Sequence, residues 1–453
     1  MRAISSFIAL NRFGMGARPG DEETLRGAPR GWLNAQVRRD RPALPVYGRL
    51  RSSEQILRAI FEGRRTSPQA QAAAVRRAYR RDFYPSLVTR ARLMIASDTP
   101  FADRMLLFWS NHFSLSTTRR ISGAAIPAFE REVIAPHVFG RFSDMLRAAA
   151  RHPCMLIYLD NVASMGPNSP LGIRRRQRGN PGSLNENFAR ELLELHTLGV
   201  DGGYTQDDIV ELAKALTGWG HGGIRLGNQE APVHGRFQFF EIAHEPGARR
   251  ILGQAYPEGG AEQGLAVLDD LARHPSTARH IARKLARHFI ADDPPEPAIT
   301  HIAQVFAETD GDLAAVSRAI IALDAAWADP LAKVKTPYEF VIGVHRAAGR
   351  IRARRQEINE PLRVLGQVPF SAPSPQGWSD RAGDWIAPQS LMRRIEWTRR
   401  LAATLPSSLA PADFLEAVIG PVASADVRLW VARAPSHDAG LAMIFASSEF
   451  QRR

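Results

Sequence analysis

The chain has 453 residues, of which 44% are hydrophobic and 23% are charged, the composition of an ordinary soluble globular protein with a large core. No apolar run approaches the ~18 residues that a membrane-spanning helix needs, and the single cysteine, Cys154, excludes an intramolecular disulfide and any multi-cysteine metal site. The formal charge of +13 favours anionic partners, but the arginines are dispersed and no nucleic-acid-binding module is recognisable, which argues against nucleic acid.

Helix-start signals recur along the chain and predict a mainly α fold, a large multi-helix globular domain. Proline stands at the first helical position in Ser67-Pro68, Thr99-Pro100, His152-Pro153 and Thr336-Pro337. Capping-box spacing is present at Ser52 with Gln55, at Ser183 with Glu186 and at Thr205 with Asp208. Helices are expected near residues 52–62, 67–82, 86–97, 100–112, 127–138, 143–151, 153–160, 184–198, 206–218, 261–273, 276–290, 296–307, 312–323, 337–349, 388–404, 411–419 and 437–450.

One segment departs from the helical pattern. Residues 233–242 are rich in aromatic residues and predict a short strand or a β-hairpin-like insertion. We expect a single domain over residues 1–453, with two lobes as the alternative, one of about 1–255 carrying the central motifs and one of about 256–453. Residues 1–16 lack the apolar region of a signal peptide, so the chain is expected in the cytoplasm.

Three long connections are expected to have a role beyond joining helices. They cover residues 161–182, 218–237 and 366–388, and they are rich in glycine and proline. Long loops in compact domains are usually functional or disordered. The first two flank the predicted helices 184–198 and 206–218, which places those helices next to a candidate site.

The helix predicted over residues 184–198 concentrates chemistry-bearing side chains. Phe188 and Leu192 belong to its apolar stripe, and Gly199 suits a left-handed C-cap. Glu191 falls beside that stripe and is expected to be half-buried, where a carboxylate either finds partners or serves a functional site. His196 borders the stripe on the other side, and a structural role is expected for it.

Two further clusters are candidates for the site. Trp109, Asn111 and His112 end the helix 100–112, where His112 is either a partner of the helix dipole or an acid/base group. His244 follows the predicted strand, and Trp219 ends the helix 206–218, where packing is the favoured role for the indole. No HExxH, P-loop, GxSxG or Rossmann fingerprint occurs, and a divalent metal on two histidines and a carboxylate stays open without a pair at ligand spacing.

Motifs from one end of the chain to the other resemble the domain-of-unknown-function 1800 family. These are LNRFGMG (10–16), FWSNHFSLS (108–116), HPCMLIYLDN (152–161), the long run 185–219, HEPGARRILG (244–253), LARHPSTARHIARKLARHF (271–289) and ASSEFQ (446–451). The resemblance implies a bacterial protein, often encoded beside a member of the domain-of-unknown-function 1501 family, which is similar to alkaline phosphatases and sulfatases. It also implies exported relatives, in contrast to the cytoplasmic expectation for this chain.

The resemblance implies that the following residues of this chain match the family pattern: Trp109, Asn111, His112, Asn185, Glu186, Asn187, Arg190, Glu191, Glu194, Trp219 and His244. One departure concerns the position after His244, where the family usually has aspartate and this chain has Glu245. That difference argues against a ligand or base of fixed length at position 245.

Two functions from different classes remain open. In the first, an enzyme uses Glu191, His112 and His244 as acid/base groups on a polar or anionic, glycan-like substrate, by hydrolysis with two carboxylates or by elimination. Its substrate would be bound by Asn111, Asn187, Arg190, Glu194, Trp109 and Trp219. In the second, the protein is a non-catalytic binding or maturation partner of the phosphatase-like neighbour and has a filled core around Glu191.

Overall fold

The computed structural model describes residues 2–25, 27–39, 50–226, 229–230, 232 and 234–453. In these residues helices dominate, as the sequence predicts, and the strands are short. All four predicted proline-started helices are present, because the preceding residue stands outside the helix and proline needs no amide partner at its first position. No helix in the described ranges has the length and apolar character needed to cross a membrane.

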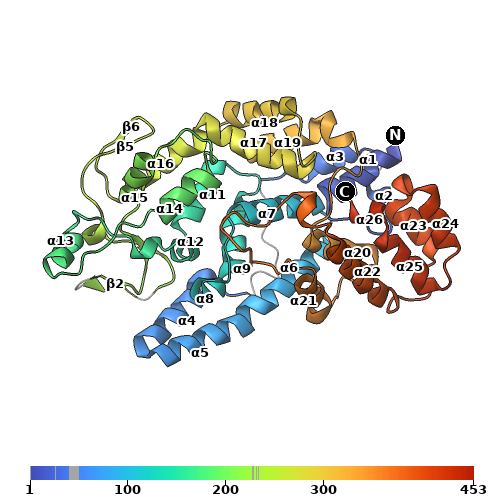
Figure 1. Ribbon diagram of the computed structural model, residues 1–453, viewed down its shortest axis with the longest axis horizontal. Coiled ribbons are helices and arrows are strands. Elements are labelled where there is room, and N and C mark those ends of the chain that lie inside the picture. Colours follow the sequence, from blue (N-terminus) through green and yellow to red (C-terminus); the bar gives the residue numbers. More distant parts are fainter. Residues whose placement is uncertain (1, 26, 40–49, 227–228, 231, 233) are drawn as a thin grey trace.

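The first third of the chain supplies a projecting helix pair and a central helix. The pair is α4 (Ser53–Thr66) and α5 (Pro68–Ala78), which pack side by side at the lower edge of the view (Figure 1). The central helix is α7 (Pro100–His112). The other helical segments of this part are α1 (Arg2–Ile8), η1 (Ala9–Phe13), α2 (Asp21–Leu25), α3 (Pro29–Ala35), η3 (Tyr79–Phe83), α6 (Tyr84–Ala96), α8 (Arg120–Gly123), α9 (Ile126–Phe129), η4 (Glu130–Ile134) and α10 (Ala135–His137).

The middle of the chain adds short helices and the strands. The helical segments are α11 (Phe142–Arg151), α12 (Pro153–Tyr158), η5 (Asn161–Ala163), α13 (Pro170–Gln177), α14 (Asn187–Glu191), η6 (Leu192–His196), α15 (Gln206–Ala215) and η7 (Glu241–Ala243). In the part of the chain that the structure describes, the strands form three antiparallel pairs, β1 (Trp219–His221) with β4 (Phe237–Phe239), β2 (Arg225–Leu226) with β3 (Gln229–Glu230), and β5 (Arg249–Ile251) with β6 (Gln254–Tyr256).

The expected strand near 233–242 is therefore present as β4, but its partner is β1 and not a second strand of the same segment. The β5–β6 hairpin was not predicted. The connection 161–182 also differs from a plain loop, because it contains α13, which the Ser169 hydroxyl caps and Pro170 starts.

The last part of the chain closes the fold. Its helical segments are α16 (Ala261–Arg273), α17 (Pro275–Phe289), α18 (Glu296–Glu308), α19 (Leu313–Ala322), η8 (Asp324–Trp327), α20 (Pro337–Ala347), α21 (Arg355–Val364), η9 (Ala382–Asp384), α22 (Pro388–Ala402), α23 (Pro411–Ile419), η10 (Gly420–Val422), α24 (Ala425–Ala432), α25 (His437–Ala446) and α26 (Ser448–Gln451). Helices α17 and α18 pack together along the upper edge of the view (Figure 1).

One large core joins the two ends of the chain. Its buried hydrophobic residues run from Phe7 to Phe450, and the N- and C-terminal segments lie near each other (Figure 1). Arg453 pairs with Lys333 through two backbone hydrogen bonds of 3.0 and 2.8 Å, and the Arg12 guanidinium donates to the Arg453 carbonyl at 3.0 Å. These contacts hold the end of the chain beside α17 and α20, which form part of the candidate site.

Candidate functional site

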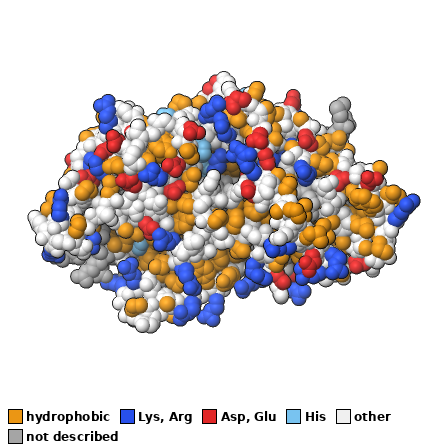
Figure 2. Space-filling model, in the orientation of Figure 1, with side chains coloured by type: hydrophobic (Ala, Val, Ile, Leu, Met, Phe, Trp, Pro, Cys, Tyr) orange, Lys and Arg blue, Asp and Glu red, His pale blue; other side chains and the backbone are white. Residues whose placement is uncertain are grey.

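A cavity of about 730 Å³ lies at the C-terminal end of α7. Its walls are the last turn of α7, the π-helix η6, the inner face of α17, the first turn of α20 and the loop 367–385 between α21 and α22. Figure 2 shows basic and histidine side chains gathered in the upper middle of one face, over the region where α7 and α17 lie in Figure 1. The loop 366–388 is one of the three connections that the sequence singles out, and it forms one wall of this cavity.

The predicted helix 184–198 is divided in two. It is α-helical in α14 and changes to the wider π form in η6, a feature that is frequent at functional sites. The expected capping box of Ser183 with Glu186 does not form, because the helix starts only at Asn187 and the Asn185 side chain accepts from its amide at 3.0 Å. Gly199 does adopt the expected left-handed conformation, with φ of +86°.

The end of η6 fixes two histidines of the cavity. The ring of His112 donates from Nε2 to the His196 carbonyl at 3.2 Å, and His280 donates from Nε2 to the Leu195 carbonyl at 3.3 Å. Burial lowers the pKa of His112 well below its usual value and lowers that of His280 to about 4. Both rings are therefore neutral, and the tautomer of His112 leaves its Nδ1 free to accept.

Lys284 donates to that acceptor. Its Nζ lies 3.0 Å from His112 Nδ1, and no carboxylate of the described residues forms a salt bridge with it. Burial, which disfavours the ammonium form, lowers the pKa of Lys284 to about 8. An amine that titrates near neutrality beside a fixed imidazole is suited to accept a proton or to attack an electrophile.

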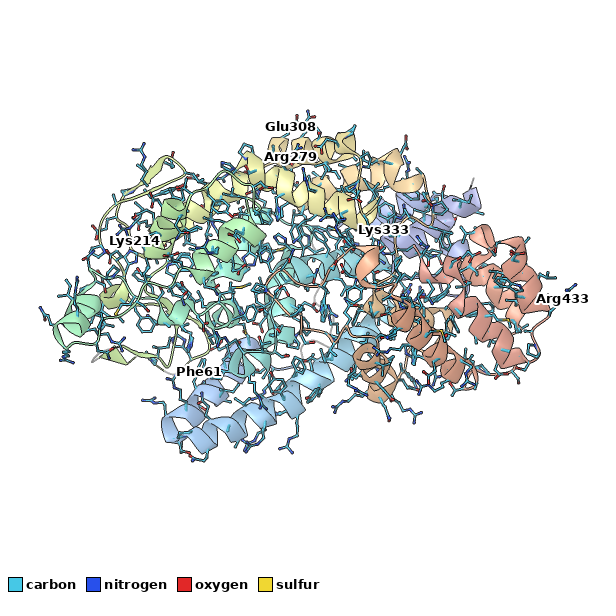
Figure 3. The ribbon with its side chains drawn as sticks, viewed as in Figure 1. Phe61, Lys214, Arg279, Glu308, Lys333 and Arg433 are labelled. Atoms are coloured by element: carbon cyan, nitrogen blue, oxygen red, sulfur yellow. The ribbon has the colours of Figure 1, made fainter. Side chains whose placement is uncertain are left out.

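A second polar cluster lies further along the same face of α17 and lines the same cavity. His288 donates from Nδ1 to Asp380 at 2.7 Å, and Arg453 and Lys333 lie 3.6 and 3.8 Å from the other oxygen of the same carboxylate. His288 and these cations hold the pKa of Asp380 well below its usual range against the opposing effect of burial. Lys333 lies to the right of the centre of the view, where the N-terminal helices, α17 and the C-terminal part of the chain meet (Figure 3).

Glu339, in the first turn of α20, belongs to the same cluster. It forms buried ion pairs with Arg104 and with Arg453, the latter at 3.1 Å, and its second oxygen also accepts from the backbone amide of Thr336 at 2.9 Å. The two arginines lower the pKa of Glu339 to about 2, although burial alone would raise it. Glu339 and Asp380 are thus kept ionised at neutral pH.

Aromatic side chains and a backbone clamp complete the walls. The Arg90 guanidinium is held by Glu130 through two hydrogen bonds of 2.7 Å and lies over the rings of Tyr338 and Phe370. The Asn111 side chain binds Trp378 twice, donating to its carbonyl at 2.8 Å and accepting from its amide at 2.7 Å. These bonds fasten the loop 367–385 to α7.

Residue 377 in that loop has to be glycine. Gly377 has φ of +85°, and an added Cβ would lie 2.5 Å from the Asn111 carbonyl oxygen. The left-handed backbone and the close approach together bring Trp378 within reach of the clamp. Trp378 and Trp385 then lie with their rings 6.0 Å apart on the cavity side of the loop.

The structure brings some of the expected site residues to this cavity. Asn111, His112 and Glu194 line it, and fully buried Trp109 packs edge-on against the His112 ring. Arg190 does not line it but lies 3.8 Å from Glu194 and 3.3 Å from Glu186, which is the expected ion network.

Glu191 is half-buried, as its position beside the apolar stripe predicts, but it does not line the cavity. Burial and the neighbouring Glu194 raise its pKa. Asn187 also faces elsewhere, donating from its side chain to the Leu159 carbonyl at 3.3 Å. The expected meeting of Glu191 with His112 and His244 therefore does not occur at this cavity.

His244 and Trp219 belong to a different part of the structure. His244 donates from Nδ1 to the Thr217 carbonyl at 2.9 Å, and the Trp219 indole is buried against Phe237. Glu245 accepts from the backbone and side-chain amides of Asn168 at 2.7 and 2.6 Å. These contacts attach the connection 161–182 to the β1–β4 pair.

Sequence reasoning did not single out Lys284, Asp380 and Arg287. The sequence does contain a pattern that points to Lys284 and Arg287. His280, Lys284 and His288 are spaced by four residues and so share one face of α17, and Arg287 lies beside them. Asp380 had no local signal. Its partners come from α17, from residue 333 and from the end of the chain.

Among the described residues, no group of three histidine, cysteine, aspartate or glutamate side chains is arranged to hold a metal ion. No curated protein and no solved structure matches the chain. A family described as "Protein of unknown function (DUF1800)" matches residues 8–452, nearly the whole chain. The chain therefore belongs to the DUF1800 family.

Proposed function

We propose that the protein is an enzyme that performs acid/base chemistry on a polar, anionic substrate in the cavity at the end of α7. The observation that carries the proposal is the contact between Lys284 and His112, in which an amine with a pKa of about 8 faces a cavity and has an imidazole as its hydrogen-bond acceptor. Strongly perturbed titratable groups in a cleft are typical of catalytic sites. A non-catalytic partner of another protein would not need such a pair.

Lys284 is the proposed proton acceptor. At neutral pH a useful fraction of its amine is unprotonated, and its lone pair can take a proton from the substrate. His112 is a positioning residue in this scheme, because the bond of its Nε2 to the His196 carbonyl directs Nδ1 toward the amine. General base catalysis of this kind typically contributes ~10²–10⁴-fold to the rate.

Elimination is favoured over hydrolysis by two carboxylates. A glycoside hydrolase needs one carboxylic acid that is protonated when the reaction starts. Asp380 and Glu339 do not meet that need, because neighbouring cations keep both ionised. An amine base fits the removal of a carbon-bound proton next to a carboxylate, so the proposed reaction is a lyase reaction.

The walls of the cavity fit an acidic sugar. Arg287 and Arg381 line the cavity and attract an anionic group, while Trp378 and Trp385 offer flat apolar surfaces of the kind on which sugar rings pack. Ser374 and Gln376 of the same loop add groups that can hydrogen bond to hydroxyls. We therefore assign the substrate to the uronate-containing glycans.

The test is an elimination assay on a panel of polyuronates and sulfated glycans, read as the ultraviolet absorbance of the new conjugated double bond. We expect one substrate of the panel to be cleaved by the wild type and Lys284→Gln to lose at least about 100-fold in rate. Lys214→Gln is the matched control, because Lys214 lies on α15 and pairs with Glu211 outside the cavity. Equal rates in the wild type and Lys284→Gln, or an uncleaved panel, would contradict the proposal.

A further inference from the structure

Lysine is rare in this chain, and the few lysines differ sharply in their surroundings. Only four of the 59 basic residues are lysines, namely Lys214, Lys284, Lys333 and Lys335. Lys214 bonds Glu211 at 2.5 Å, and it lies toward the opposite side of the view from Lys333 (Figure 3). Lys333 is buried against Asp292 and the Asp380 carbonyl.

Lys335 is also fully engaged. Its Nζ donates to the Asn11 side-chain oxygen at 3.0 Å and to the Phe450 carbonyl at 2.8 Å. Lys284 alone among the four lines the cavity, and in the described part of the chain its Nζ has only the His112 ring as a recorded hydrogen-bond partner. Among the described residues, the Lys284 amine thus has one hydrogen-bond partner and lines the cavity.

We propose that Lys284 is also a nucleophile, which forms an imine with a small carbonyl compound that carries an anionic group, and that Arg287 binds the anion. This activity goes beyond elimination, since it requires bond formation to Lys284 Nζ. It shares the residue with the proposed function but does not depend on turnover of a glycan. The ligand class is that of 2-oxo acids and open-chain sugar acids.

The position of Arg287 supports an anion next to the reacting carbon. Lys284 and Arg287 are three residues apart on α17, so both side chains lie on the face that lines the cavity. The Nε of Arg287 donates to the Asp292 carbonyl at 3.1 Å, which fixes the guanidinium, while no partner in the described ranges is recorded for its two terminal nitrogens. Those two nitrogens can form the paired hydrogen bonds that a carboxylate accepts.

The covalent step balances without a further reagent. The amine lone pair of Lys284 forms a C–N bond to the carbonyl carbon, and the C=O π electrons move to oxygen. One proton passes from the nitrogen to that oxygen, while His112 Nδ1, 3.0 Å from Nζ, accepts a hydrogen bond from the remaining N–H and holds the nitrogen in place. A second proton transfer from nitrogen to oxygen lets water leave as the C=N bond forms.

Arginine at this position would not do the same chemistry. A guanidinium stays protonated in proteins and has no free lone pair on nitrogen, so it binds anions but does not form an imine. A lysine at this one cavity position, in a chain whose cations are almost all arginine, is therefore consistent with a need for an amine. Burial supports the same reading, because it lowers the pKa of Lys284 to about 8 and so increases the fraction of free amine.

The experiment is reductive trapping with pyruvate and cyanoborohydride on the full-length protein, followed by mass spectrometry of its peptides. The four lysines and the N-terminal amine lie in separable or sequenceable peptides, so the site of the adduct can be read directly. We expect the adduct on Lys284, with a labelling rate that rises through a midpoint near pH 8. Adducts on the N-terminus or Lys214 at the same rate as on Lys284, or no adduct on Lys284, would overturn the proposal.

Two variants and one control variant separate the parts of the proposal. Lys284→Arg should lose the adduct while keeping the wild-type unfolding temperature, and Lys214→Arg should keep the adduct. Arg287→Gln should need at least about tenfold more pyruvate for half-labelling, as expected for one lost charged hydrogen-bonding partner, and should label normally with the uncharged ketone acetone. An unchanged pyruvate dependence in Arg287→Gln would refute the anion site.

The outcome is independent of the elimination assay. If pyruvate is not trapped on Lys284 but a glycan is still cleaved, only the imine proposal is refuted, because a general base does not form a bond to carbon. Trapping on Lys284 without elimination on any glycan would support the imine and refute the proposed lyase function.

Discussion

The clamp between Asn111 and Trp378 should control the mobility of one wall of the cavity. Two hydrogen bonds of 2.8 and 2.7 Å join the Asn111 side chain to the Trp378 backbone. A protein hydrogen bond contributes about 1 kcal/mol net, so Asn111→Ala should remove about 2 kcal/mol of local stability. That loss corresponds to roughly 30-fold faster exchange of the Trp378 amide through local opening.

Hydrogen exchange read by mass spectrometry on peptides from the loop 367–385 measures this effect. We expect faster exchange in that loop, with the backbone amides of helix α17 unchanged. Asn34→Ala is the matched control, because Asn34 is an exposed asparagine on α3, away from the cavity. The reasoning is refuted by unchanged exchange at the loop, or by an equal increase over the whole chain, which would indicate global destabilisation.

Three further predictions concern the buried groups around the site. Glu130→Gln leaves buried Arg90 without its partner and should lower the free energy of unfolding by about 3–5 kcal/mol in urea titrations, whereas the exposed Glu62→Gln should change it by less than about 1 kcal/mol. The pKa of Glu339 is lowered from 4.5 to about 2. The ionised carboxylate therefore contributes fully to the free energy of unfolding above pH 4.5, and this contribution is lost as the pH falls toward 2. Glu339→Gln should therefore reduce the slope of stability against pH in that window by up to about 1.4 kcal/mol per pH unit, and an unchanged slope would contradict the ion-pair assignment. Burial raises the pKa of Cys154 well above 9, so a thiol reagent should label it only at denaturant concentrations that unfold the protein; labelling of the native protein would show that this part of the core opens on its own.

Local sequence patterns were sufficient to predict most of the helices and the residues at which they begin. The predicted capping boxes of Ser52 and Thr205 form, because a hydroxyl and an acceptor three residues later interact within one turn. The same kind of pattern failed at Ser183, because its carbonyl accepts from the Met165 amide at 3.2 Å and the Asn185 amide donates to the Ser164 hydroxyl at 3.1 Å, so helix α14 begins only at Asn187. A helix start is thus predictable only where no tertiary contact competes for the backbone.

The candidate site was predictable in part. The end of α7 and the loop 366–388 were both singled out, and His112 and Asn111 do line the cavity. Glu191 was chosen because helical periodicity places it beside the apolar stripe, and it is half-buried there. Helical periodicity predicts which face of a helix a residue lies on, but not which segment packs against that face. It therefore could not show that Glu191 does not line the cavity.

The sequence by itself determined a mainly α fold, the single cysteine and the membership of one family, because periodicity, residue counts and motifs are properties of the chain alone. Only the tertiary structure decided the partners of the site, where Lys284 meets His112 across 172 positions and Asp380 meets His288 across 92. The pKa values of these groups follow from burial and from neighbouring charges. Both depend on how distant segments pack, and no local pattern in the sequence contains that information.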